Sequence, residues 1–293
     1  MNRYAAAWIV LMGAAFFGSL STLVKLGYQD GFTTGELTGS QYIIGTGGLW
    51  LLTLLFQRKK VPWKAAGKLL ASGIFPGLVA VFYYWSLQSI NASLAIVLLF
   101  QFTWMGIVLD FILHKHRPGR SQWGALLLIL VGTILAAGVI SFTTGSIHLT
   151  GVLFGLLAAV SYTGFIHVSG NTANQVPSLQ RSGWMMTGAT ITVSVVFPPQ
   201  FLIEGTLWEG LWIWGTALGV LGVILPPLLF TKGVPHIGAG MATILGSVEL
   251  PVVLLLSFFI LNEKITPLQW SGTLLILLGI ILSEGRWLDR RKK

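Results

Sequence analysis

Long apolar runs, separated by short polar breaks, fill almost the whole chain and limit its fold more than any other feature. A helix needs about 20 mostly apolar residues to cross the hydrocarbon core of a bilayer. The bilayer offers the backbone no hydrogen-bond partners, so such runs must be helical, and the alternation typical of barrel strands is absent from them. The sequence therefore predicts an all-α membrane protein.

Composition supports the same class and excludes others. Only 9% of the 293 residues are charged, whereas roughly a quarter are charged in an average soluble domain. The formal net charge of +9 does not indicate a nucleic-acid partner, because the basic residues lie in short breaks between the apolar runs and in a tail. The absence of cysteine excludes disulfides and thiolate metal sites. No cofactor or metal site is predicted.

The apolar runs predict ten membrane spans, and no break between them is long enough for a soluble domain. The first run is longer than the core of a signal peptide, and no small-residue cleavage site follows it, so we expect it to remain as a helix. The predicted spans cover residues 4–26, 35–56, 69–87, 91–113, 121–140, 149–169, 182–202, 208–231, 237–261 and 267–284.

Ten spans place both termini on one side of the membrane, and the charges indicate which side. Of the 18 Lys and Arg residues, 16 fall on the side of the termini, and only Lys25 and Lys264 fall outside this set. By the positive-inside rule, both termini are expected in the cytoplasm, with the protein in the inner or plasma membrane. Residues 287–293 would form a basic cytoplasmic tail.

The chain contains an internal repeat. When it is shifted by 147 positions, residues 90–135 match residues 237–282 without a gap, and about a third of the pairs are identical. Matches of Leu and Ile are frequent in membrane helices by chance. The Gln-Trp pair at Gln122 and Gln269 is rarer, and it supports a duplication.

An odd number of spans per repeat implies that the two halves insert with opposite orientation. Residues 114–117 form a strongly basic loop, whereas the matching residues 261–264 are nearly neutral, as an inversion requires. We therefore expect two inverted five-helix repeats, at residues 1–140 and 149–286. Inverted repeats are typical of secondary transporters, in which exchange of the two halves' conformations opens a central site to either side.

The second copy of the repeat carries a specific pattern. It contains Glu249-Leu250-Pro251, then Asn262-Glu263-Lys264-Ile265-Thr266, then Gln269-Trp270-Ser271-Gly272 and Leu275 to Gly279. This pattern resembles the end of each repeat in the EamA branch of the drug/metabolite transporter superfamily. In the first copy Trp104 replaces the proline and His116 replaces the glutamate.

The resemblance implies ten helices with both termini inside and a central cavity formed mainly by helices 1–4 and 6–9, with helices 5 and 10 at the periphery. Members of this family export amino acids, drugs or metabolites. The resemblance therefore implies a small-molecule substrate without identifying it.

Glu249 is the strongest candidate for a substrate-binding or coupling residue. It lies at the centre of the ninth span and is the only ionisable residue expected at the midplane. A carboxylate facing lipid there would cost a few kcal/mol, so it should face other helices or a water-filled cavity. Burial disfavours the charged form of a carboxyl group, which suits proton coupling. Gly246 lies on the same helical face, together with Ala239 and Ala242, and would leave space beside the carboxyl group.

Four further residues are candidates, each with a structural alternative. Gln101 and Trp104 share a helical face at the middle of the fourth span, where they could meet substrate or simply pack between helices. Tyr83 belongs to an aromatic run that could line a cation-accepting pocket or form an interfacial belt. Lys25 could attract an anionic solute or extend to the membrane surface. Glu249 itself could be a structural acid held by a neighbouring helix.

Small residues and prolines predict local packing. Pro226 and Pro227 lack backbone N–H groups and should distort the eighth span, as a gate element would. Three pairs of glycines at a spacing of four residues should allow close helix contacts. These pairs are Gly73 and Gly77, Gly151 and Gly155, and Gly215 and Gly219.

The leading hypothesis is a secondary transporter that exports a small metabolite, such as an amino acid or a drug-like solute, by alternating access. A passive facilitator or an uptake carrier of the same fold remains an alternative. An intramembrane enzyme would need paired catalytic groups at one depth, which the sequence does not offer, and a receptor or scaffold would leave the inverted repeat unexplained. Expected partners are the substrate, protons as a candidate coupling ion and membrane lipids, in a monomer or homodimer.

Overall fold

The computed structural model describes residues 2–57, 61–114, 120–136, 148–173, 175–237 and 245–290. Every regular element in these ranges is a helix, and each of the ten predicted spans contains at least one. The elements are α1 (Arg3–Gln29), α2 (Thr34–Phe56), α3 (Trp63–Ser72), α4 (Ile74–Ser89), α5 (Ala92–Leu99), α6 (Phe102–His114), α7 (Arg120–Ala136), α8 (Leu149–Asn171), α9 (Ser178–Val196), η2 (Gln200–Leu202), η3 (Leu207–Leu211), α10 (Trp212–Leu218), η4 (Gly219–Ile224), α11 (Leu225–Ile237), α13 (Glu249–Phe259) and α14 (Pro267–Arg290).

Several helices are long and apolar enough to cross a membrane. By length and composition, four stretches qualify among the described residues, at Tyr4–Gln29, Trp63–Ser89, Leu149–Val168 and Leu207–Phe230. Four shorter apolar helices accompany them, at Ala92–Gly106, Trp123–Ala136, Glu249–Phe259 and Pro267–Leu282. The prediction of an all-helical chain with several membrane spans is therefore confirmed.

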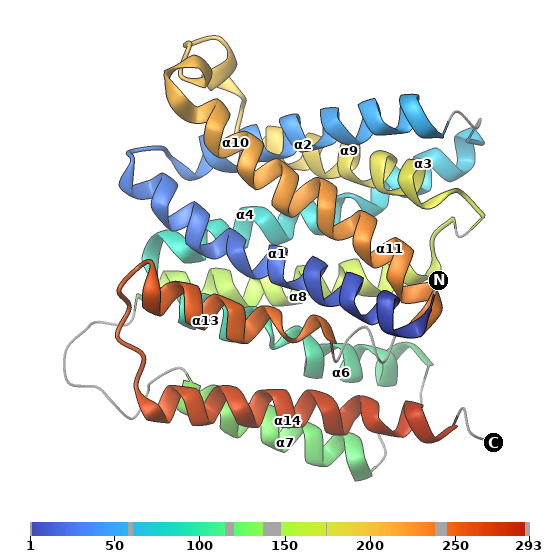
Figure 1. Ribbon diagram of the computed structural model, residues 1–293, viewed down its shortest axis with the longest axis vertical. Helices are drawn as coiled ribbons and strands as arrows, with labels where there is room; N and C mark the ends of the chain where they lie inside the picture. The colour runs from blue at the N-terminus through green and yellow to red at the C-terminus, as the bar shows by residue number, and fades with distance from the viewer. Residues whose placement is uncertain are drawn as a thin grey trace.

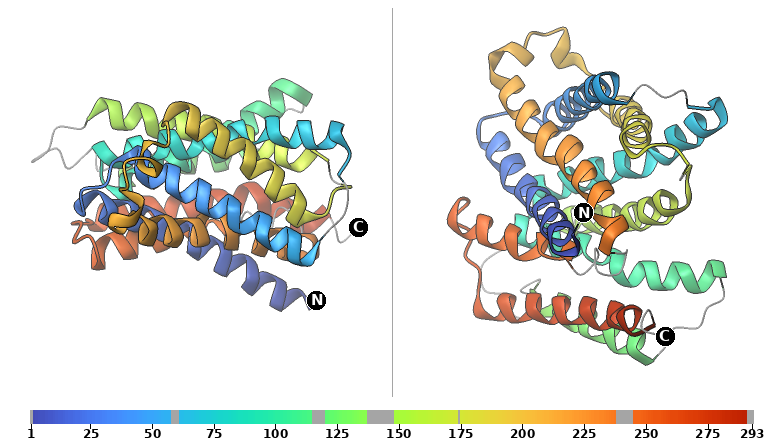
Figure 2. Two further views of the ribbon diagram at one scale, coloured as in Figure 1. Left: turned by 90° about the horizontal axis from the view of Figure 1, so that it is seen from above. Right: turned by 45° about the vertical axis from the view of Figure 1, so that its right-hand side comes forward.

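The helices run side by side, and α1 begins at the same end of the bundle at which α14 ends (Figures 1 and 2). At one edge, α7 and α14 pack along each other, apart from most other helices (Figure 1). Glycines allow this close contact, because a Cβ on Gly132 would lie 2.7 Å from the carbonyl oxygen of Gly272. The pair α7–α14 occupies the position that the family resemblance implies for helices 5 and 10.

The three predicted glycine pairs lie at helix contacts. Gly73 and Gly77 face the backbone of α9, and Gly215 and Gly219 face α2. Gly151 and Gly155 of α8 receive the side chains of Ile90 and Leu98, among others. At all three contacts a larger side chain would meet backbone or buried side chains, so these glycines are packing positions, as predicted.

The fourth and ninth spans are each interrupted, where the sequence predicts a single helix. In the fourth, α5 ends at Leu99 and α6 begins at Phe102. In the ninth, a turn at Ser247 and Val248 precedes the start of α13 at Glu249. Phe102 and Glu249 are 147 positions apart (249 − 102), so the two interruptions occupy matching positions in the internal repeat.

The backbone hydrogen bonds around the two interruptions also match. Three bonds of the first half recur in the second half between residues 147 positions further on, and two of the three span three residues instead of the four of a regular α-helix. In the first half these bonds run from Gln101 N to Leu98 O, from Thr103 N to Phe100 O and from Met105 N to Gln101 O. Their counterparts in the second half run, in the same order, from Val248 N to Leu245 O, from Leu250 N to Ser247 O and from Val252 N to Val248 O.

The two interruptions have different causes. Pro251 has no N–H, so it cannot bond the Ser247 carbonyl oxygen, which accepts the N–H of Leu250 instead, at 3.1 Å. In the fourth span no proline is present. There the Gln101 side-chain Nε2 donates to the Val97 carbonyl oxygen at 2.8 Å. In a continuous helix, the backbone N–H of Gln101 would bond this oxygen instead.

The eighth span is distorted ahead of its two prolines, as predicted. A π-helical segment, η4, ends at Ile224, and α11 begins with Leu225-Pro226-Pro227. The prolines supply no N–H to the carbonyl groups one turn earlier, so the preceding turn is free to widen. Whether this segment acts as a gate stays a prediction.

Candidate functional site

Glu249 is the first residue of α13, directly after the interruption of the ninth span, and its side chain is partly buried. Its backbone oxygen lies against α1, since a Cβ on Gly18 would be 2.9 Å from it. Tyr83 of α4 and Tyr162 of α8 both lie within electrostatic range of its carboxylate. Residues from three other helices therefore surround the start of α13.

Phe102, the counterpart of Glu249 in the first half, reaches the same place. Its ring packs edge-on against Tyr162, with ring centroids 4.6 Å apart and an interplanar angle of 69°. The Phe100 ring lies next to it as well, with a centroid distance of 5.5 Å. Tyr162 thus contacts the interruption of the first half, whereas α13, which follows the interruption of the second half, packs against α1 and against α5, the helix that leads to the first interruption.

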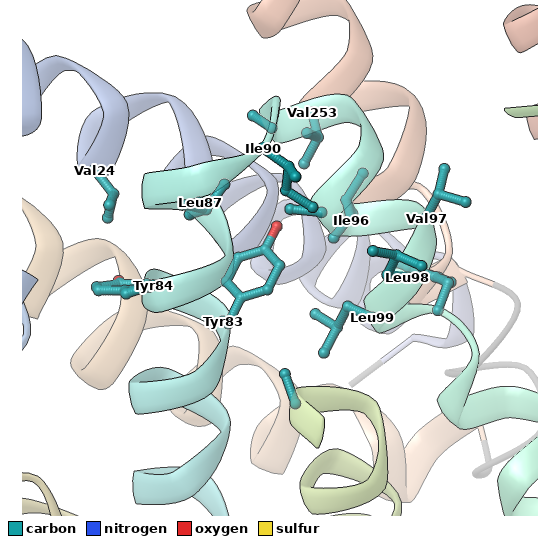
Figure 3. Packing of buried hydrophobic residues seen from close by; sticks show 14 of the residues in the cluster. Val24, Tyr83, Tyr84, Leu87, Ile90, Ile96, Val97, Leu98, Leu99 and Val253 are labelled. Carbon is teal, nitrogen blue, oxygen red and sulfur yellow. The ribbon is translucent and has the colours of Figure 1, made fainter. Parts of the chain in front are cut away.

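Tyr83 is held in place by α1. Its hydroxyl group shares a 2.8 Å hydrogen bond with the Ser21 hydroxyl, and its side chain is only 6% exposed. In Figure 3 Tyr83 points toward Ile90 and Ile96, whereas Tyr84 leaves α4 on another side. Tyr84 donates to Gln41 and accepts at its backbone oxygen from Tyr28, so it belongs to a separate polar cluster.

The carboxylate of Glu249 and the hydroxyl group of Tyr162 make no hydrogen bond or ion pair within the part of the chain that the structure describes. Helices α4 and α5 carry no charged residue, and α13 carries none besides Glu249. These three helices therefore offer the carboxylate no cation, and Tyr83 and Tyr162 offer aromatic rings within electrostatic range of it. A carboxylate beside aromatic rings is a chemical environment that binds an ammonium group well.

Gln101 and Trp104 lie together, as their spacing predicts, because the Trp104 Nε1–H donates to Gln101 Oε1 at 2.9 Å. The amide nitrogen of Gln101 donates to Val97 and, at 2.7 Å, to the Thr133 hydroxyl of α7. The side chain is 3% exposed. Gln101 therefore holds the interrupted helix against α7, and a direct contact with substrate stays a prediction.

The remaining two candidates, Gly246 and Lys25, face partners other than Glu249. Gly246 lies toward α11, where a Cβ added to it would be 3.9 Å from the nearest side chain, that of Phe230. Lys25 is partly buried on α1, and the nearby charge that acts on it belongs to Glu263. Ala239 and Ala242, predicted on the face of Glu249, lie outside the described residues.

Tyr162 and Ser21 are site residues that the sequence does not predict. Tyr162 lies near the middle of α8 in a run of small and apolar residues, and its polar ring at that depth is a signal that could have been used. Ser21 gives no comparable signal, since serines are frequent in membrane helices. Its position opposite Tyr83 depends on how α1 crosses α4.

Comparisons with known proteins place both halves in one family. A profile described as "EamA-like transporter family" matches residues 4–138 and again residues 149–284. The chain is 27% identical to an uncharacterised transporter of Archaeoglobus fulgidus over 283 residues, which is 96% of each chain. It is 28% identical over 211 residues to an uncharacterised inner membrane transporter of Salmonella typhimurium, covering 71% of this chain and 68% of the relative.

Two further similarities extend this result. A relative from Pseudomonas aeruginosa, named a "probable biotin transporter", is 26% identical over 254 residues, or 83% of this chain and 84% of its own length. A solved crystal structure matches the fold over 100% of both chains, with a TM-score of 0.66 and 16% identity. At that identity the solved structure supports the fold alone.

Proposed function

We propose a carrier function from the premise that the chain belongs to the EamA-like transporter family, whose profile matches both of its halves. The chain is a multi-pass membrane transporter and not an enzyme. Its substrate is a small molecule. The proposal adds the mechanism, the direction and the class of substrate.

The mechanism is alternating access between two inverted five-helix repeats, residues 1–140 and 149–286, which together span the membrane ten times around a central site. The observation that carries it is the pair of matched interruptions at Phe102 and Glu249. Interrupted helices at matching positions of two repeats are the usual location of the substrate site in such carriers. Because α13 packs against α5, the helix that leads to the other interruption, one site can serve both conformations.

The orientation places both termini and the tail at residues 287–293 in the cytoplasm. Its support is the distribution of basic residues, 16 of which fall on the side of the termini. The start of α1 and the end of α14 at one end of the bundle agree with it (Figure 1). The direction is export, as in the transporters that the chain resembles.

The substrate class is a small solute with an ammonium group, such as an amine, an amino acid or a cationic drug-like molecule. Glu249 would supply the opposite charge, and Tyr162, Tyr83 and Phe102 would supply aromatic faces for the rest of the solute. The name of the Pseudomonas relative points to biotin, which is an anion at neutral pH. A solute of that kind would meet a carboxylate in this chain, and Lys25 of α1 lies within electrostatic range of Glu263 instead.

The test is solute flux in proteoliposomes across an imposed pH gradient, with the parent protein and Glu249→Gln compared. The matched control is Glu204→Gln, which removes an exposed carboxylate from a loop. We expect Glu249→Gln to abolish flux of ammonium solutes and its response to pH, and the control to behave as the parent. Unchanged flux in Glu249→Gln would exclude this site, and flux that ignores pH in the parent would indicate a passive facilitator.

A further inference from the structure

The connection between α13 and α14 holds a carboxylate against the other half of the protein. Glu263 Oε1 accepts the backbone N–H of Ala92 at 2.8 Å. Glu263 Oε2 accepts the backbone N–H of Ser93 at 3.3 Å and its hydroxyl group at 2.7 Å. Glu263 belongs to the second matched half, and Ala92 and Ser93 begin α5 in the first, so these three bonds join the two halves.

These bonds satisfy groups that α5 leaves open. The first N–H groups of a helix have no partner within the helix, and its N-terminus favours a negative charge. Asn91 stands at the cap position but makes no side-chain capping bond. The capping group of α5 is therefore Glu263, which lies 171 positions away in the sequence from Ala92. Bonds to a carboxylate are roughly twice as strong as bonds between neutral groups.

The connection is shaped to present this carboxylate. Asn262 has a φ of 54°, a left-handed conformation that asparagine tolerates better than most residues. The backbone N–H of Glu263 donates to the Ser257 carbonyl oxygen at 3.0 Å. Beyond it, Thr266 and Gln269 cap the start of α14 reciprocally, with bonds of 2.8 and 3.3 Å. The Glu-Lys-x-Thr-x-x-Gln pattern thus caps two helices, one in each half.

We propose that Glu263 is a latch that closes the transporter at this end of the bundle and must release α5 whenever the central site opens toward that end. The helix it holds leads directly to the site, because α5 ends at the interruption that Phe102 follows. Lys25 of α1 lies within electrostatic range of the Glu263 charge. The latch rests on the carrier mechanism but not on the identity of the solute.

By residue type, the repeat provides this latch at one end. The residues that match Glu263 and Ser93 in the repeat are His116 (263 − 147) and Gly240 (93 + 147). Both lie outside the described residues, and by residue type they offer neither the carboxylate nor the hydroxyl group. The resting protein is therefore closed at the end that carries Glu263. In the proposed orientation this is the outer end, and the site of an exporter at rest would face the cytoplasm.

The test uses the absence of cysteine from the chain, which allows single-cysteine reporters in the full-length protein in membranes. Thr22, three residues from Lys25 on α1, reports access from the latched end, and Thr103, just beyond the interruption at the central site, reports access from the opposite end. Both hydroxyl groups are buried without a hydrogen-bond partner in the described structure, so cysteine there removes no bond. Each reporter is treated with a membrane-impermeant maleimide, Thr22→Cys from the latched side and Thr103→Cys from the other.

In Glu263→Gln, we expect Thr22→Cys to react about tenfold faster than in the parent, as the loss of charged hydrogen bonds implies, and Thr103→Cys to react more slowly. Ser93→Ala, which removes one of the three bonds, should shift both rates in the same directions by less. Glu36→Gln is the matched control, because Glu36 caps α2 within its own half through Thr33.

Opposite changes at the two reporters support the latch. Faster labelling of both reporters would mean that the fold has loosened, and unchanged labelling of both would mean that Glu263 does not control opening; either result overturns the proposal. Neither readout needs a known solute, so failure of the latch is separable from failure of the proposed transport function. Ser93→Ala keeps the test available if Glu263→Gln does not fold.

Discussion

The two halves of this transporter interrupt a helix at the same position by different means. In the first half, the side chain of Gln101 takes the carbonyl group that the backbone would use, and in the second half Pro251 supplies no N–H at all. Three of the resulting backbone hydrogen bonds nevertheless match between the halves. The repeat therefore conserves a backbone shape, while the side chains that produce the shape have diverged.

The side chains at the two interruptions differ in charge, as an asymmetric substrate site would require. Phe102 begins α6 with an apolar ring, and its counterpart Glu249 begins α13 with a carboxylate. The latch differs in the same way, since Glu263 is matched by His116. In the proposed mechanism, equal backbones would allow the halves to exchange conformations, and unequal side chains would give the site a charge and the cycle a preferred resting state.

The largest effect is expected from removing the charge that only the second half carries. In Glu249→Gln, affinity for an ammonium solute should fall by roughly 30-fold or more, because truncating one partner of a desolvated charge pair costs about 2–5 kcal/mol. Phe102→Leu, at the matching position, should lower affinity much less. Equilibrium binding to the purified protein measures both. Equal losses in the two variants would contradict the assigned difference between the halves.

The next largest effect is expected in Gln101→Ala, as a loss of folding stability. It leaves the Trp104 indole N–H without its acceptor and removes the bonds to Val97 and Thr133, so we expect a cost of about 1–3 kcal/mol. A lower midpoint of thermal unfolding would show it. Gln29→Ala, at an exposed position at the end of α1, is the control. A midpoint equal to that of the control would show that Gln101 does not hold the interruption.

Substitutions of matching glycines in α7 and α14 test whether the two helices pack equally tightly at both positions. A Cβ on Gly132 would lie 2.7 Å from a backbone oxygen, whereas one on its counterpart Gly279 would lie 2.8 Å from the more adaptable Ile129 side chain and 3.0 Å from the nearest backbone oxygen. Gly132→Ala should cost about 1–2 kcal/mol, and Gly279→Ala less. Gly67→Ala, with nothing within 4 Å, should be neutral or stabilising. The midpoints of thermal unfolding rank the three variants. A reversed order would contradict the close contact between α7 and α14 at Gly132.

The smallest effect on stability is expected at Pro251. In Pro251→Ala the new N–H can bond the Ser247 carbonyl oxygen and straighten the helix, so stability should rise by up to about 1 kcal/mol while solute flux falls. Pro198→Ala, in an exposed loop, should change neither. Retained flux in a stabilised Pro251→Ala would show that the interruption in the second half is not needed for transport.

Much of the architecture could be predicted from local sequence. Apolar runs of membrane length identified the helices, and the position of Glu249 at the centre of a span identified the residue around which α1, α4 and α8 gather. Repetition of Gln122-Trp123 at Gln269-Trp270 pointed to the two halves that the family profile matches. These features depend on hydrophobicity and spacing, which are visible without a fold.

The remaining features depend on contacts between distant residues. The fourth span is interrupted at Phe100 and Gln101, where no glycine or proline gives a local signal. Residue type alone also does not decide whether the Gln101 amide contacts substrate or packs between helices. Tyr162 joins the candidate site because its ring packs against Phe102 of α6. The partners of Glu263 are 170 and 171 positions away, beyond any spacing rule.

The most direct test of the account is a pair of distances measured in the same protein with and without an ammonium solute. Spin labels at Asn91 and Lys264 report the end that carries the latch, and labels at Leu113 and Lys232 report the opposite end; all four positions are exposed. Alternating access predicts that one distance lengthens as the other shortens when solute is added. Two distances that stay fixed, or that change in the same direction, would contradict it.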